Sequence, residues 1–114
     1  MKGKPLLPTL RTKKRYVVYE TISDKDIKNN DVYNEIVSSY KECFGKFGLG
    51  EAGIMNTKIY KKNKGILKVN HKYLDKLKTA MAMITEVDKK KVIIKTVTVS
   101  GILKKAKAKI NASH

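Results

Sequence analysis

The side chains that most often carry catalysis are sparse in this chain of 114 residues. It has one cysteine, Cys43, and two histidines, His71 and His114, which lie far apart in the sequence. These three residues cannot supply the four ligands of a usual zinc site. Cys43 falls at the edge of a predicted apolar helix stripe, where we expect a buried thiol rather than a nucleophile paired with a histidine. The sequence therefore predicts no catalytic residues and no metal ligands.

The carboxylates lead to the same expectation. The most closely spaced are Asp24, Asp26 and Asp31, and their position at helix starts explains them more simply than a metal site does. We therefore expect a chain that is not a catalyst on its own and that binds no cofactor itself. The possibility of a protein cofactor that assists RNA chemistry stays open. A single cysteine also rules out an internal disulfide, which fits a reducing, cytoplasmic location.

Positive charge is the chemical property that this chain has in excess. It carries 26 Lys and Arg against 10 Asp and Glu, a net charge of +16. Residues 61–114 account for +12 and residues 1–60 for +4. Such a balance predicts a polyanionic partner, with nucleic acid ahead of an anionic membrane surface. No stretch is apolar enough to span a membrane, and no apolar signal-peptide region follows the basic N-terminus.

Three clusters of cations are the candidate RNA contacts. They are Arg11, Lys13, Lys14 and Arg15; then Lys61, Lys62, Lys64 and Lys68; and finally Lys104, Lys105 and Lys107. The first cluster runs directly into a predicted strand, so a rigid element would hold its charge in a defined direction. Arginine can fork across a phosphate, whereas lysine acts as a point charge. Exposed lysines also keep proteins soluble and protect sheet edges, and for the second cluster that explanation and a binding role are equally supported.

Hydrophobic periodicity indicates the elements that must position these clusters. It predicts strands at 16–22, 54–62, 66–70 and 92–99, amphipathic helices at 31–44 and 71–85, and a short basic helix at 102–110. The apolar stripes of the first and last helices include Phe47 and Ile102. Residues 63–65 form the predicted hairpin turn. Residues 45–53 (GKFGLGEAG) are expected to be a flexible connection that could hold one helical turn, because they follow a helix and lack the ending of a phosphate-binding P-loop.

The order strand, helix, strand, strand, helix, strand predicts the split βαβ arrangement shared by RNA-recognition modules. We expect an α+β, ferredoxin-like (RRM-like) βαββαβ sandwich with an antiparallel four-stranded sheet. An extra C-terminal helix should cover part of the second sheet face. Residues 1–10 would form an extended arm, 11–110 a single RNA-binding domain, and 111–114 a frayed tail. The segment GILKVNH lacks the aromatic run of RNA-recognition motifs, so base stacking on the sheet is not predicted.

Four segments together resemble one family, in their order and in their spacing. These are LPTLRTKKRYVVYE, FGKFGLGEAGI, KGILKVNHKYLDKLKTAMAMI and VIIKTVTVSGILKKA. They resemble the archaeal ribonuclease P protein component 2 family, which is related to the eukaryotic subunit shared by ribonuclease P and ribonuclease MRP. The resemblance covers about residues 6–109.

The resemblance implies a noncatalytic subunit of the ribonucleoprotein that removes the 5′ leader from precursor tRNA. In that family the RNA subunit carries the active site and uses Mg²⁺. The resemblance further implies a TIM-barrel protein partner, component 3, often in a two-plus-two assembly, with the pair supporting the catalytic domain of the RNA. The expected partners are thus ribonuclease P RNA, component 3 and, through the complex, precursor tRNA.

Three alternatives stay open from composition and pattern. A ribosomal or other general RNA-binding module of the same fold class fits the charge equally well. A small ferredoxin-like enzyme, such as an acyl-phosphate hydrolase, would need an anion-binding loop with an adjacent Arg and Asn, which GKFGLGEAG does not supply. A purely structural adaptor between proteins would leave the charge of +16 unexplained.

Overall fold

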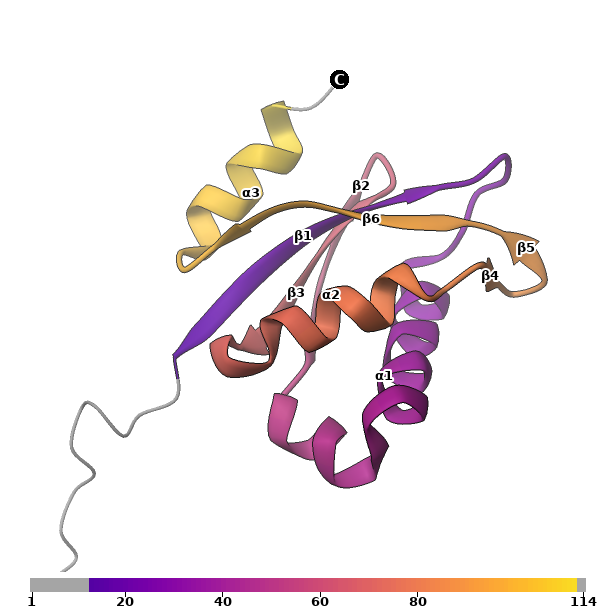
Figure 1. The fold of residues 1–114 in the computed structure, drawn as a ribbon. Coiled ribbons are helices and arrows are strands. Elements are labelled where there is room, and N and C mark those ends of the chain that lie inside the picture. Colours follow the sequence, from indigo (N-terminus) through magenta and orange to yellow (C-terminus); the bar gives the residue numbers. More distant parts are fainter. Residues whose placement is uncertain (1–12, 113–114) are drawn as a thin grey trace, which may run out of the picture.

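The computed structural model describes residues 13–112 and confirms the predicted fold class (Figure 1). Its elements are β1 (Lys14–Ile22), α1 (Asn29–Ala52), β2 (Met55–Lys61), β3 (Lys64–Asn70), the 3₁₀ turn η2 (His71–Tyr73), α2 (Leu74–Ala82), β4 (Glu86–Val87), β5 (Lys90–Lys91), β6 (Ile93–Ser100) and α3 (Leu103–Ala112). Four strands form one sheet in the order β2-β3-β1-β6, with every neighbouring pair antiparallel. This is the ferredoxin-like βαββαβ arrangement with an added C-terminal helix.

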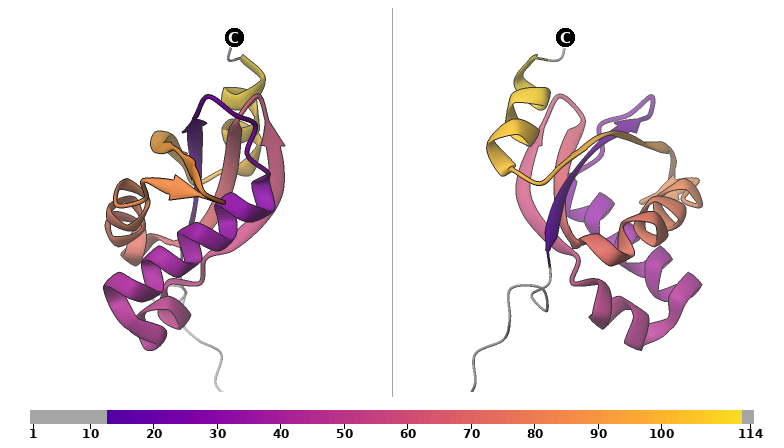
Figure 2. Two further views of the ribbon diagram at one scale, coloured as in Figure 1. Left: turned by 90° about the vertical axis from the view of Figure 1, so that its right-hand side faces the viewer. Right: turned by 60° about the vertical axis from the view of Figure 1, so that its left-hand side comes forward.

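The sheet has a helix layer on each face. Helices α1 and α2 cover one face, and α3 packs on the opposite face (Figures 1 and 2). Successive residues of β1 point to opposite faces, so Val17 and Tyr19 belong to the core beneath α1 and α2, whereas Val18 belongs to the smaller core beneath α3. Both faces of β1 are therefore buried, which explains its nearly continuous apolar and β-branched sequence.

Tyr19 fixes the register of the two central strands. It lies directly opposite Gly65 of β3, and its ring occupies the space that a side chain at Gly65 would need. The Tyr19 hydroxyl donates a hydrogen bond to Oδ1 of Asn29 at 2.9 Å, which ties β1 to the start of α1. Burial, reinforced by the nearby Tyr60 hydroxyl, raises the pKa of Tyr19 above its ordinary value.

Helix α1 differs from the sequence prediction. The expectation of a flexible connection at 45–53 is wrong, because helical structure continues to Ala52 and ends at Gly53 in a left-handed conformation. Gly45, at φ 80° and ψ 172°, breaks the helix internally. That break redirects the helix, so Phe47 is 92 % exposed instead of lying on the apolar stripe, while Ala52 further along is buried in the larger core.

The β2–β3 hairpin follows the prediction with a shifted turn. Lys62 and Asn63 form a two-residue loop, both with positive φ, as such tight hairpins require. The alternation expected along β2 fails at Lys58, which has a φ of 64° and lies within an irregular stretch of the pairing. Beyond it, Ile59 packs toward α3 and Tyr60 toward the larger core.

Residues 86–91 form a small hairpin that the sequence did not predict. Strands β4 and β5 are joined by Asp88 and Lys89, again both with positive φ. The hairpin buries Val87, and Val92 follows it into the core. Its short strands and many charges gave no clear periodicity, so this element was missed.

A serine turn leads from β6 into helix α3. Ser100 Oγ accepts a hydrogen bond from the Ile102 backbone N–H at 3.0 Å, and the Ile102 carbonyl accepts the first bonds of the helix, from the N–H groups of Lys105 and Ala106. Ala106 and Ile110 are buried against the sheet, but Ile102 precedes the helix and is 52 % exposed, so its predicted place on the apolar stripe is wrong. The helix reaches Ala112, into the segment for which fraying was expected. The predicted N-terminal arm lies outside the described residues.

Candidate RNA interface

The first predicted cluster lies at the start of β1, where the structure describes three of its four members. Lys13 is exposed, and its backbone carbonyl accepts a hydrogen bond from the His71 N–H at 2.8 Å, so the position of the backbone is fixed. Arg11 lies outside the described residues. Strand β1 therefore holds this charge at one end of the sheet, as the sequence predicted.

Lys14 and Arg15 are partly buried and have structural neighbours. A Cβ built at Gly53 would lie 3.3 Å from Nζ of Lys14, which places this ammonium at the C-terminal end of α1, where the helix dipole favours a cation. Arg15 donates from Nη1 to the carbonyl of Lys14 at 3.1 Å and lies beside Gly101. Both cations are thus held in place before any partner binds.

The structure divides the second predicted cluster. Lys61 and Lys62 are exposed at the β2–β3 turn, whereas Lys68 is four residues along β3 from Lys64. At about 3.4 Å per residue this is roughly 14 Å. Lys68 lies directly opposite Tyr16 of β1, so it belongs with the first cluster in space.

Lys64 does not fit its predicted role as a direct RNA contact. It is only 7 % exposed, and its Nζ lies 3.6 Å from the Glu20 carboxylate. Glu20 is the residue opposite Lys64 in the β1–β3 pairing, so the strand register brings the two charges together. Because the Lys64 ammonium is buried and paired with Glu20, it is not available to bind a phosphate. The sequence placed Lys64 in a hairpin turn, and the one-residue shift of that turn puts it in β3 instead.

The third cluster lies on the outer surface of α3. Lys104, Lys105 and Lys107 are exposed, whereas Ala106 and Ile110 face the sheet. The helix therefore displays a basic surface above the sheet and uses its narrow apolar edge for packing. The RNA contacts proposed for all three clusters stay predictions, but the exposure of this one fits such a role.

Helix α3 leaves one end of its sheet face uncovered. A row of residues across the strands contains Met55, Lys68, Tyr16 and Ser100 in adjacent register positions. In the parallel row nearer the middle of the sheet, Ile66 and Val18 are buried beneath α3. In the first row, by contrast, Met55 is 55 % exposed, and Lys68, Tyr16 and Ser100 are partly exposed.

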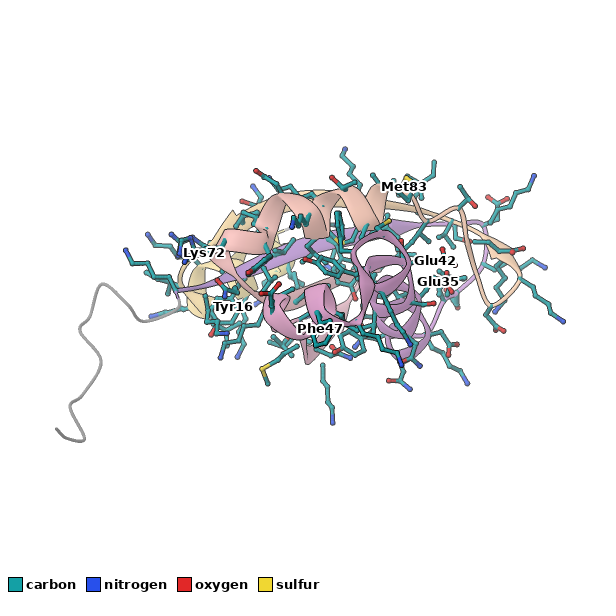
Figure 3. The ribbon with its side chains drawn as sticks, turned by 60° about the horizontal axis from the view of Figure 1, so that its bottom comes forward. Tyr16, Glu35, Glu42, Phe47, Lys72 and Met83 are labelled. Atoms are coloured by element: carbon teal, nitrogen blue, oxygen red, sulfur yellow. The ribbon has the colours of Figure 1, made fainter. Side chains whose placement is uncertain are left out.

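Acidic residues gather at the opposite end of the molecule. A hollow of about 370 Å³ between α1 and the β4–β5 hairpin is lined in part by Glu35, Glu42, Glu86 and Asp88. Figure 3 shows Glu35 and Glu42 at one end and Tyr16 with Lys72 at the other. Cys43 also lines this hollow and is exposed, so the prediction of a buried thiol is wrong. The Cys43 thiol faces the hollow, which the β4–β5 hairpin does not fill.

Residues 13–112 contain neither a cluster of metal ligands nor a membrane-spanning helix. Within this range no three or more His, Cys, Asp or Glu side chains are grouped as metal ligands would be. No helix in the same range combines the length and the apolar character needed to cross a membrane.

Fold and surface together define a class of protein: a small ferredoxin-like α+β domain with basic surfaces on its first strand and last helix. The Rpp14/Pop5 family matches residues 15–111. Proteins named ribonuclease P protein component 2 match over almost the whole chain. The Pyrococcus abyssi protein is 36 % identical, covering 100 % of this chain and 98 % of its own, and the Thermococcus kodakarensis protein is 32 % identical, covering 99 % and 95 %. This chain belongs to the Rpp14/Pop5 family.

Two further comparisons agree with this assignment. The Methanosarcina acetivorans ribonuclease P protein component 2 is 33 % identical, covering 93 % of this chain and 80 % of its own. A chain in the cryo-EM structure of yeast ribonuclease MRP superimposes with a TM-score of 0.66, covering 82 % of this chain and 77 % of that one, at 14 % identity. At that identity the match speaks for the fold alone, and the fold is the one described above.

Proposed function

We propose that this chain is a protein subunit of ribonuclease P that supports the catalytic domain of the RNA subunit during removal of the 5′ leader from precursor tRNA. Membership of the Rpp14/Pop5 family carries this proposal. The active site and its Mg²⁺ would lie on the RNA. The chain would act as a noncatalytic subunit in the cytoplasm.

The charge distribution suggests how such a subunit works. A folded RNA brings its phosphates close together, and they repel one another. Cations held on a rigid scaffold offset this repulsion in the folded RNA more than in the unfolded RNA. The protein must bind the folded RNA more tightly, because otherwise it cannot shift the equilibrium. The exposed lysines of α3 and the cations at the start of β1 meet this requirement, since secondary structure holds them in place.

Exposed apolar side chains outside the predicted basic clusters are suited to protein partners. Phe47 after the Gly45 break is 92 % exposed and Met83 after α2 is 64 % exposed. Met83 also lines the acidic hollow, which would repel RNA and attract basic side chains. We propose that these surfaces receive protein subunits, including a TIM-barrel subunit in a two-plus-two assembly.

A second candidate function is a general RNA-binding module, such as a ribosomal protein, because the basic surface would serve it equally well. Cleavage of precursor tRNA by the cognate RNA at limiting Mg²⁺ distinguishes the two. The reaction should be compared with RNA alone, with the TIM-barrel protein alone and with both proteins. If this chain adds nothing to the reaction that already contains the TIM-barrel protein, the ribonuclease P proposal fails.

The basic surface can be tested with two matched triple variants. One changes Lys104, Lys105 and Lys107 of α3 to alanine, and its control changes the exposed Lys25, Lys41 and Lys91 to alanine. Each lowers the net charge from +16 by three, to +13. Alanine favours helix, so α3 should stay folded. The α3 variant should lose stimulation of cleavage and lower the salt dependence of RNA binding by roughly 2–3 in log–log slope, at about 0.7–0.9 per phosphate. Equal losses in both variants would show that only total charge matters.

A further inference from the structure

We propose that the uncovered end of the sheet, centred on Tyr16, binds an unpaired RNA nucleotide by stacking its base on the tyrosine ring. This inference rests on the proposed function, because it names the form of RNA that one surface receives. The sequence did not predict base stacking on the sheet, because the segment that forms β3 lacks the aromatic run of RNA-recognition motifs. In the structure the aromatic residue comes from β1 and the cation from β3.

The strand register places the necessary groups side by side. Tyr16 and Lys68 are directly opposite in the β1–β3 pairing. Side chains opposite one another in antiparallel strands have Cβ atoms roughly 4.5–5.5 Å apart. An aromatic face next to an ammonium is the combination that binds single-stranded nucleic acid: the ring stacks with a base and the cation attracts the neighbouring phosphate.

The surroundings of Tyr16 distinguish it from a core residue. One side of it packs against the smaller core beneath α3, which limits its freedom. It nevertheless stays partly exposed, whereas Val18, the next residue of β1 on the same face, is completely buried. Helix α3 therefore supports the tyrosine without covering it. A rigid ring loses little conformational entropy when a base stacks on it.

Charge complementarity favours RNA over a protein at this surface. Lys13 and Lys14 precede Tyr16 on β1, and Lys68 is its neighbour on β3. Within residues 13–112 none of these three lysines forms an ion pair, in contrast to Lys64, which pairs with Glu20, and Lys90, which pairs with Asp88. Lys72 lies at the same end of the molecule (Figure 3). An unneutralised basic surface attracts phosphate, and the partly exposed tyrosine among the lysines adds a stacking surface.

The chain contains no tryptophan, which permits a direct test. Tyr16→Trp would introduce a single indole, whose fluorescence a stacked base quenches. The matched control is Tyr73→Trp, on the helix side of the sheet, where Tyr73 packs against the larger core. The probe is a short oligoadenylate, with double-stranded RNA of the same length for comparison. We expect oligoadenylate to quench the indole at position 16 and leave the control unchanged. Binding without quenching at position 16 would overturn the proposal.

Affinity gives a second and independent readout. Tyr16→Leu keeps an apolar side chain against the smaller core but removes the ring, and should weaken oligoadenylate binding about tenfold, within the range found for base–aromatic stacking. The log–log salt dependence of oligoadenylate binding by Tyr16→Leu should not change, because no cation is removed. Tyr16→Phe, which keeps the ring, should bind like the wild type. Lys68→Gln should lower the slope by about 0.7, one phosphate on a single strand. Equal losses for single- and double-stranded RNA in Tyr16→Leu would contradict stacking.

Failure of this inference and failure of the proposed function give different results. If wild-type protein stimulates precursor-tRNA cleavage but Tyr16→Leu binds oligoadenylate normally, the stacking site is wrong and the function stands. If Tyr16 stacks on RNA but the wild-type chain does not stimulate cleavage, the function is wrong. Loss of binding to the TIM-barrel protein in Tyr16→Leu, with RNA binding intact, would assign this surface to a protein and overturn the inference.

Discussion

Replacing Gly65 with alanine should destabilise the protein strongly, although the change adds a single methyl group. Gly65 faces Tyr19 across the β1–β3 pairing, and an added Cβ would overlap the hydroxyl and ring carbons of that tyrosine. Tyr19 is completely buried, so its ring cannot move into solvent. Either the ring shifts within a packed core or the two central strands separate.

The size of the effect follows from two contributions. Overpacking a well-packed core costs about 1–3 kcal/mol. A shifted ring also loses the 2.9 Å hydrogen bond from Tyr19 to Asn29, which contributes about 1 kcal/mol. The free energy of unfolding should therefore fall by about 2–4 kcal/mol. At roughly 4 °C per kcal/mol for a chain of this size, the melting temperature should fall by about 8–16 °C.

The assay compares two glycine-to-alanine variants by thermal and urea unfolding. Gly50 lies in the second part of α1, and a Cβ there would meet nothing within 4 Å. Because alanine favours helix by up to about 1 kcal/mol over glycine, Gly50→Ala should raise the melting temperature. Adding Tyr19→Leu to Gly65→Ala should cost less than the sum of the two single changes, since both act on one contact. A Gly65→Ala protein that unfolds at the same urea concentration as the wild type would refute the reasoning.

Two further predictions concern buried ionisable groups. Glu20→Gln removes the partner of buried Lys64 and should cost about 1–2 kcal/mol in urea unfolding, less than the 3–5 kcal/mol of a fully buried pair because Glu20 is 33 % exposed. The control Asp88→Asn breaks the exposed pair with Lys90 and should cost almost nothing, so equal effects would contradict this account. Burial raises the pKa of Tyr19 in the folded protein above 10.0. The contribution of the neutral, buried tyrosine to the free energy of unfolding is therefore fully present below pH 10.0 and is lost as the pH rises further. Tyr19→Phe should therefore show a shallower loss of unfolding free energy above pH 10.0 than the wild type, and identical slopes would refute the assignment.

The sequence by itself determined the main elements and their order. Strand β1, helices α1 and α2, and strand β6 were predicted because apolar periodicity is a local property that can be counted along the chain. The order of these elements was enough to predict the ferredoxin-like fold. The basic surfaces at the start of β1 and on α3 were also visible, because each cluster is continuous in sequence and belongs to one element.

Tertiary structure decided which of the predicted site residues lie together. Lys64 and Lys68 are neighbours in sequence, but β3 carries one into a buried ion pair and the other to a place beside Tyr16. Strand register produces this separation, and it depends on pairing between distant segments. No count along the chain contains that information.

The same holds for the exposed apolar residues and the acidic hollow. Phe47 continues the helical spacing of α1, yet the positive φ of Gly45 turns it outward. Glycine tolerates such a conformation wherever it occurs, so the sequence alone does not show that the helix breaks there. The hollow lined by Glu35 and Asp88 exists only because the β4–β5 hairpin folds back toward α1. Local sequence was enough to predict most of the helices and strands, and long-range packing determined which side chains meet.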